Sequence, residues 1–119
     1  MKQKGIILNL WLDDSHQIHK FELSGHAGYA EYGLDVVCAA VSALGISAVN
    51  GLERYLPNKP EVEVDDLQGF LSCTLPELEP VTLDHAQWIL GTMVLGIEGI
   101  QQSYGSEYVK INRRRWTPC

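Results

Sequence analysis

The chain has 119 residues, of which 45% are hydrophobic and 20% charged, and its formal net charge at pH 7 is −6. These values are typical of one globular domain, here residues 1–119, and we find no internal repeat or low-complexity tract. The negative charge disfavours binding to nucleic acid, whose phosphates it repels, and favours a basic partner.

The cysteines and the N-terminal segment indicate the compartment. The chain has three cysteines, Cys38, Cys73 and Cys119, and an odd number argues against a disulfide framework. Their wide spacing does not fit a zinc motif, so we expect neither a metal nor another cofactor. The first apolar run stops at Asp13, so we expect no signal peptide and no membrane span. Reduced thiols then predict a cytoplasmic protein.

The first half of the chain predicts a β-hairpin, a loop and a helix. Apolar and β-branched residues predict a strand at 5–12, and a second strand follows at 16–23 after a turn at 13–15. Three glycines and two tyrosines make residues 25–33 a predicted loop. Asp35 is the predicted N-cap of a helix that runs to Tyr55.

The second half repeats this outline without repeating the sequence. We predict strands around 62–64 and at 70–75, joined by a turn, and then a helix capped by Thr82 or Asp84. The three glycines inside this helix, at 91, 96 and 99, predict that it packs closely on something, because each costs about 1 kcal/mol relative to alanine. A last strand at 107–112 precedes a basic tail at 113–115.

The predicted order of elements is therefore ββαββαβ. Neighbouring strands in such an order pair mostly as hairpins, and the helices act as crossovers. The fold class is α+β: a mixed or antiparallel sheet with two long helices packed on it.

Cys38 is the candidate nucleophile. With Asp35 as N-cap, its sulfur lies in the first helical turn, near unpaired amides and the positive end of the helix dipole, which favour a thiolate. The same amides, with help from Gly33, are placed to hold the oxyanion of an acyl-transfer intermediate.

His26 is the candidate base, because it lies in the glycine-rich loop, within reach of the helix start. It would take the thiol proton and return it to the leaving amine. Asp35, Ser42, Glu31 and a backbone carbonyl remain candidates for orienting its ring. The alternative is structural: a lone cysteine on an apolar helix is commonly a small core residue, as we expect for Cys73.

Two motifs in this stretch resemble a known family. Residues 25–28, Gly-His-Ala-Gly, followed by residues 35–42, Asp-Val-Val-Cys-Ala-Ala-Val-Ser, are similar to the ribosomal-processing cysteine proteases called Prp. The resemblance extends to chain length and element order and so covers nearly the whole chain. It implies a cytoplasmic, homodimeric cysteine endopeptidase in which His26 and Cys38 form the catalytic dyad. Supporting or substrate-binding roles are assigned to the remaining motif residues and their neighbours, Gly25, Ala27, Gly28, Gly33, Asp35 and Ser42.

The resemblance also implies a substrate: an N-terminal extension on the twenty-seventh protein of the bacterial large ribosomal subunit. The acidity of the chain suits a basic ribosomal protein. We further hypothesise that residues 25–33 form a lid over the peptide, with Tyr29, Tyr32 and Leu34 lining subsites. Two alternatives stay open: a non-enzymatic assembly factor that binds a ribosomal protein or rRNA through the arginines at 113–115, and a thiol redox sensor.

Overall fold

The chain folds into one five-stranded sheet and two long helices. The structure is a computed structural model that describes residues 5–25, 32–66 and 69–117, with residues 32–35 described by their backbone. The elements are, in chain order, β1 (Ile6–Leu12), β2 (Ile18–Gly25), α1 (Tyr32–Tyr55), β3 (Glu61–Asp65), β4 (Phe70–Thr74), α2 (Pro80–Tyr104) and β5 (Val109–Arg115). This is the predicted ββαββαβ order.

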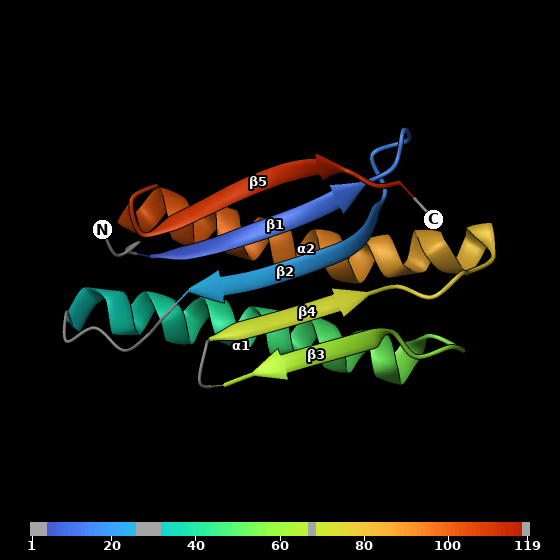
Figure 1. The fold of residues 1–119 in the computed structure, drawn as a ribbon, viewed down its shortest axis with the longest axis horizontal. Helices are drawn as coiled ribbons and strands as arrows, with labels where there is room; N and C mark the ends of the chain where they lie inside the picture. The colour runs from blue at the N-terminus through green and yellow to red at the C-terminus, as the bar shows by residue number, and fades with distance from the viewer. Residues whose placement is uncertain (1–4, 26–31, 67–68, 118–119) are drawn as a thin grey trace.

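The sheet is mixed, and its strands lie in the order β3-β4-β2-β1-β5. β5 runs parallel to β1, whereas the other three neighbouring pairs are antiparallel. Both helices lie on the same face of the sheet, α1 behind the β3–β4 side and α2 behind the β1–β5 side (Figure 1). The predicted α+β class is therefore confirmed.

The core lies between the sheet and the helices. The fully buried side chains come from strands and helices alike, and the largest are Phe21, Leu8, Leu10, Leu52, Leu90 and Ile97. Residues 36–55 of α1 are apolar and long enough to cross a membrane by length and composition alone. In this fold, however, Val37, Val41 and Leu52 of α1 are almost completely buried against the domain's own core.

The glycines of α2 have two different surroundings. A Cβ on Gly96 would lie 2.8 Å from Cδ1 of Leu44, so this glycine lets α1 and α2 pack closely, as predicted. A Cβ on Gly91 or Gly99 would meet nothing within 4 Å among the described parts of the chain. Packing inside the domain therefore explains one of the three glycines.

Three predicted boundaries are wrong. α1 begins at Tyr32, so Asp35 lies inside the helix and is not its N-cap. The helix includes Gly33, a residue that helices tolerate at a cost. α2 begins at Pro80, with Glu79 as N-cap, because proline is preorganised for the first helical position; neither Thr82 nor Asp84 caps it.

The third wrong boundary concerns the arginines at 113–115, which are not a tail. They belong to β5, where they pair with residues 10–12 of β1. The amide of Trp116 continues this pairing by donating a hydrogen bond to the carbonyl of Leu12. The strand extends further than predicted because the parallel partner β1 offers backbone groups along its whole length.

The β1–β2 turn is closed by Asp13. Its Oδ1 accepts hydrogen bonds from the amides of Ser15 and Gln17, and its Oδ2 lies 2.7 Å from Nε2 of His19. The His19 ring stacks on Trp116, with ring centroids 5.3 Å apart. Burial opposes ionisation of Asp13, but these hydrogen bonds outweigh it and lower the pKa of the carboxyl below its ordinary value of 3.8.

The lowered pKa predicts a pH dependence of stability. A carboxyl whose pKa is depressed by folding stabilises the fold fully above its unfolded-state pKa and loses that contribution as the pH falls through the folded-state pKa. We expect Asp13→Asn to lower the free energy of unfolding by about 0.5–1 kcal/mol at pH 6. Urea titrations at pH 6 and pH 3 should show the difference shrinking at the lower pH; an equal difference at both would contradict the assignment.

Candidate active site

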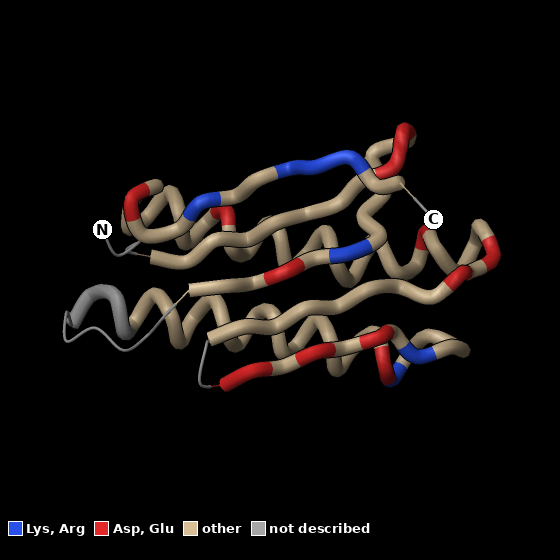
Figure 2. Tube along the Cα trace, viewed as in Figure 1, with Lys and Arg blue, Asp and Glu red and all other residues tan. Residues whose placement is uncertain are grey.

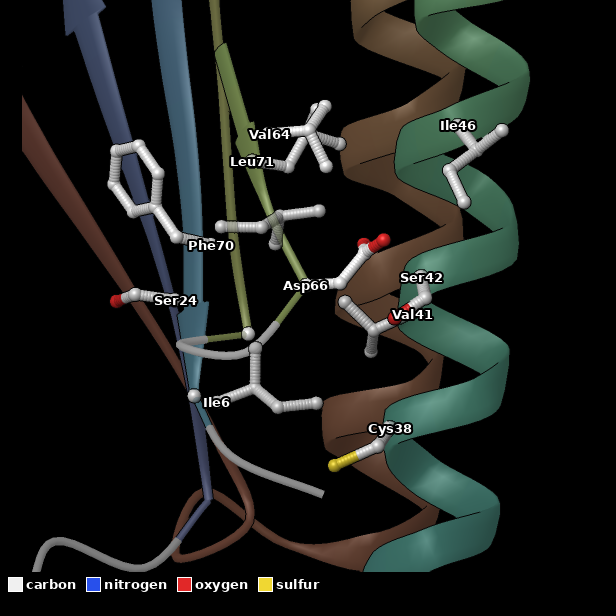
Figure 3. A pocket seen from close by; sticks show the side chains of 13 residues that line it. Ile6, Ser24, Cys38, Val41, Ser42, Ile46, Val64, Asp66, Phe70 and Leu71 are labelled. Atoms are coloured by element: carbon white, nitrogen blue, oxygen red, sulfur yellow. The ribbon is translucent and has the colours of Figure 1, made fainter. Parts of the chain in front are cut away.

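Cys38 lies in the second turn of α1, on the side of the helix that faces the sheet. Its side chain is 6% exposed, and its sulfur points from α1 toward the sheet, beside Ile6 (Figure 3). The neighbouring Val37 and Val41 are buried in the core and fix the rotation of the helix about its axis. Core packing thus determines where the sulfur is presented.

A pocket of about 290 Å³ lies next to this sulfur, between α1 and the β3–β4 side of the sheet. Four residues of α1 line it, Cys38, Val41, Ser42 and Ile46. The remaining lining comes from β1, β2, β3, β4 and the β3–β4 turn and comprises Ile6, Leu23, Ser24, Gly25, Val64, Asp66, Gly69, Phe70 and Leu71. The walls are mostly apolar, so the pocket suits apolar side chains of a ligand.

Gly25 is required where β2 ends at this pocket. Its φ is 147°, and a Cβ there would lie 2.7 Å from the carbonyl oxygen of Gly5 and 2.8 Å from the Cα of Ile6. A side chain would therefore collide with backbone, which cannot move aside cheaply. His26, the next residue, lies outside the described residues; its neighbour Gly25 lines the same pocket as Cys38.

The polar groups of the pocket come from opposite walls. Ser42 lies one turn beyond Cys38 on α1, and the Asp66 carboxylate extends from the end of β3 toward the helix (Figure 3). β3 is acidic along its length, whereas the basic residues concentrate on β5, at the other edge of the sheet (Figure 2). The pocket is therefore on the negatively charged side of the molecule.

The earlier start of α1 changes the predicted surroundings of Cys38. The unpaired amides of an α-helix are its first four, here those of residues 32–35, so the Cys38 amide belongs to the regular hydrogen-bonding ladder. The dipole effect also weakens beyond the first turn. The expectation that Cys38 itself sits among free amides is thus wrong, because the helix starts one turn earlier.

The structure brings together three of the residues singled out from the sequence: Cys38, Ser42 and Gly25 line one pocket. His26, Ala27, Gly28 and the other loop positions through Glu31 lie outside the described residues, and so do the side chains of Tyr32, Leu34 and Asp35. The lid and the ring-orienting group therefore stay predictions.

Sequence reasoning missed the far wall of the pocket. Ile46 was findable, because positions 38, 42 and 46 recur every four residues and so share a helix face. The sequence could not identify the opposite wall, which includes Val64, Asp66 and Phe70. Strand order decides which turn lies opposite α1, and the sequence does not reveal that order.

Cys73 differs from Cys38 in its surroundings. It is 2% exposed, and burial, with a smaller effect from the charge of Glu53, raises the pKa of its thiol to about 12. Such a thiol is almost entirely protonated near neutral pH and is a poor nucleophile. Among the described residues, no group of three His, Cys, Asp or Glu side chains is arranged to hold a metal ion.

Comparisons with known proteins point to a single family. The profile of the family described as cysteine protease Prp matches residues 6–110. The ribosomal processing cysteine protease Prp of Bacillus subtilis (strain 168) is 34% identical over 88 residues, which cover 73% of this chain and 79% of that protein. The protein of the same name from Staphylococcus aureus (strain Mu50) is 29% identical over 107 residues, which cover 90% and 97%.

Solved structures agree with this similarity. The essential ribosomal processing protease Prp from S. aureus in complex with a substrate peptide has a TM-score of 0.80 and 28% identity, over 92% of this chain and 99% of that one. The same protease with a covalently linked product peptide has a TM-score of 0.78 at the same identity and coverage. SMU.848 from Streptococcus mutans has a TM-score of 0.82 and 27% identity, over 95% and 97%.

The contrast between the two described cysteines predicts selective alkylation. At pH 8 a thiol with a pKa of about 12 is ionised to about one part in 10⁴, so Cys73 should react slowly with iodoacetamide. We expect Cys38, which borders an open pocket, to be modified at least about 100-fold faster. Peptide mapping by mass spectrometry separates the sites, and the two rates should converge in guanidinium. Equal rates in the folded chain would contradict this reading.

Proposed function

This chain belongs to the cysteine protease Prp family, and on that premise we propose that Cys38 is the nucleophile and His26 the general base of its peptidase reaction. The proposal is supported by the pocket, which combines the Cys38 sulfur with a mostly apolar surface able to hold peptide side chains. It is supported further by Gly25, which joins His26 to the rim of that pocket.

The reaction follows from these two groups. His26 takes the proton from Cys38, and the sulfur bonds to the carbonyl carbon of the scissile peptide. Collapse of the tetrahedral intermediate breaks the C–N bond, and the departing amine receives the proton from His26. Water, deprotonated by the same ring, then hydrolyses the thioester and releases the carboxylate product and the free thiol.

The position of Cys38 makes the histidine more important. In the second turn, the helix dipole and free amides stabilise a thiolate less than they would at a cap. A neighbouring imidazolium is then the main source of stabilisation for the anionic sulfur. Loss of His26 should therefore impair formation of the nucleophile as well as protonation of the leaving group.

The proposed substrate is the N-terminal extension of the twenty-seventh protein of the bacterial large ribosomal subunit. Relatives named ribosomal processing proteases support a ribosomal precursor, and a solved relative binds a substrate peptide. The net charge of −6 and the acidic strand beside the pocket favour a basic protein. We propose a cytoplasmic location, where reducing conditions keep the Cys38 thiol available.

The proposal predicts the behaviour of two variants. A peptide spanning the extension junction should be cut into two fragments, and Cys38→Ala or His26→Ala should each slow cleavage by at least about a thousandfold. Mass spectrometry identifies the fragments, and circular dichroism checks that the variants fold.

Cys73→Ala is the matched control, since it also removes a thiol but one that does not line the pocket. It should cleave at close to the unchanged rate. Full activity in folded Cys38→Ala would exclude the proposed nucleophile.

A binding-only assembly factor is less well supported. Its best feature is the basic cluster of three arginines, which form the exposed end of β5 rather than a tail. Arg113 pairs with Glu98 at 3.1 Å, Arg115 with Asp14 at 3.4 Å, and Arg114 lies over the ring of Trp11. Their charge is partly balanced within the chain, which weakens attraction to RNA phosphates.

We also propose that the protein is a homodimer whose copies meet along the outer face of α2. This face carries Trp88 and Leu95, each 69% exposed, and residues 86–97 include no acidic or basic residue. Gly91 and Gly99 lie on the same helix with open space where a Cβ would be. Close approach of a second copy would account both for these glycines and for the exposed apolar side chains.

The dimer proposal predicts a charge effect. Leu95→Glu should raise the dimer dissociation constant by about tenfold or more, because it would bury a carboxylate in the interface. Sedimentation velocity across a concentration series measures the change. Tyr55→Glu, equally exposed but on α1, is the control and should leave association unchanged. A monomer in both the unchanged chain and the control would refute the proposal.

A further inference from the structure

The pocket beside Cys38 carries one charged side chain among the described residues that line it, Asp66. Its other polar side chains are hydroxyls or the thiol, on Ser24, Ser42 and Cys38, and the remaining walls are apolar or glycine. Asp66 is exposed, so its charge remains available to a ligand that enters the pocket. The described lining thus offers a ligand one carboxylate beside mostly apolar walls.

The fold itself does not use this carboxylate. The turn between β3 and β4 is closed by the Asp66 backbone, whose carbonyl accepts a hydrogen bond from the amide of Gly69. Within the described residues no lysine, arginine or histidine forms an ion pair with Asp66. Its side chain extends toward α1 across the pocket instead of folding back onto its own turn (Figure 3).

The pocket has the length of a short extended peptide. Its α1 wall runs from Cys38 through Ser42 to Ile46, about 12 Å along the helix axis. An extended peptide advances about 3.3 Å per residue, so about three or four residues fit beside that wall. Asp66 lines this pocket together with Ser42. Ser42 lies four residues beyond Cys38, about 6 Å along the helix axis, which corresponds to about two residues of extended chain.

From this geometry we propose that Asp66 is a specificity-determining residue, which selects substrates with a lysine or arginine two to three residues from the scissile bond. The apolar walls would hold the aliphatic part of that side chain, and the carboxylate would hold its cationic head. Acidic Glu63 and Asp65 on the adjoining strand reinforce the local negative potential. The assignment rests on the proposed peptidase function and adds to it a preference at one subsite.

Paired peptides test this preference. A junction peptide is made with lysine, or with the uncharged and similarly shaped norleucine, at each of the four positions on either side of the scissile bond in turn. Values of kcat/KM are measured for the unchanged chain and for Asp66→Asn, which keeps the shape and removes the charge. Glu61→Gln is the control, because it removes a charge from the adjoining strand β3 but lies outside the pocket lining.

The expected result is a preference confined to one position. At two or three residues from the bond, the unchanged chain and Glu61→Gln should cleave the lysine peptide about three- to fivefold faster than the norleucine peptide, the size expected for a solvent-accessible ion pair. In Asp66→Asn the ratio should fall to about 1, with the change in KM rather than in kcat.

Three outcomes would overturn the assignment: no lysine preference at any position, a preference that survives in Asp66→Asn, or an equal loss in Glu61→Gln. Cleavage of every peptide without preference would leave the peptidase function intact while removing the role of Asp66. If no peptide were cleaved, the peptidase function would be refuted. The role of Asp66 would then be tested by measuring the affinity of labelled peptides for the Cys38→Ala chain by fluorescence anisotropy. Equal affinity for the lysine and norleucine peptides there would overturn it.

Discussion

The packing of α1 on the sheet is the contact on which the site depends. Val37, Val41 and Leu52 are each no more than 1% exposed, so this face of the helix cannot turn without emptying the core. Each side chain of this kind contributes about 1.5–3 kcal/mol through burial. The positions one residue later, Cys38 and Ser42, are consequently held at the edge of the core, where the pocket begins.

In this arrangement, one stripe of α1 packs in the core and the next stripe lines the pocket. Neighbouring helical positions differ in direction by about 100°, so one stripe can fill the core while the next faces a ligand. The sheet supplies the opposite wall through β3, β4 and the turn between them. The position of the Cys38 side chain is therefore set by the packing of its own helix.

Local pattern was enough to predict the elements, because alternation and helical spacing are properties of short segments. The alternating run through Phe21 and the apolar stripe through Val41 gave strand and helix correctly, and hairpins followed from their order. Helix starts were less predictable. α1 includes Gly33 despite the cost of a glycine in a helix, and α2 begins at Pro80, which suits a first turn. Asp66 could not be assigned to the site, since its approach to α1 depends on strand order.

The most direct test is to trap the site with a peptide and determine where it lies. A junction peptide ending in a thiol-reactive vinyl sulfone, crystallised with the unchanged chain, should be bonded to Sγ of Cys38 and should extend along α1 between Ser42 and the β3–β4 turn. Attachment to another cysteine, or a peptide leading away from that pocket, would contradict the account.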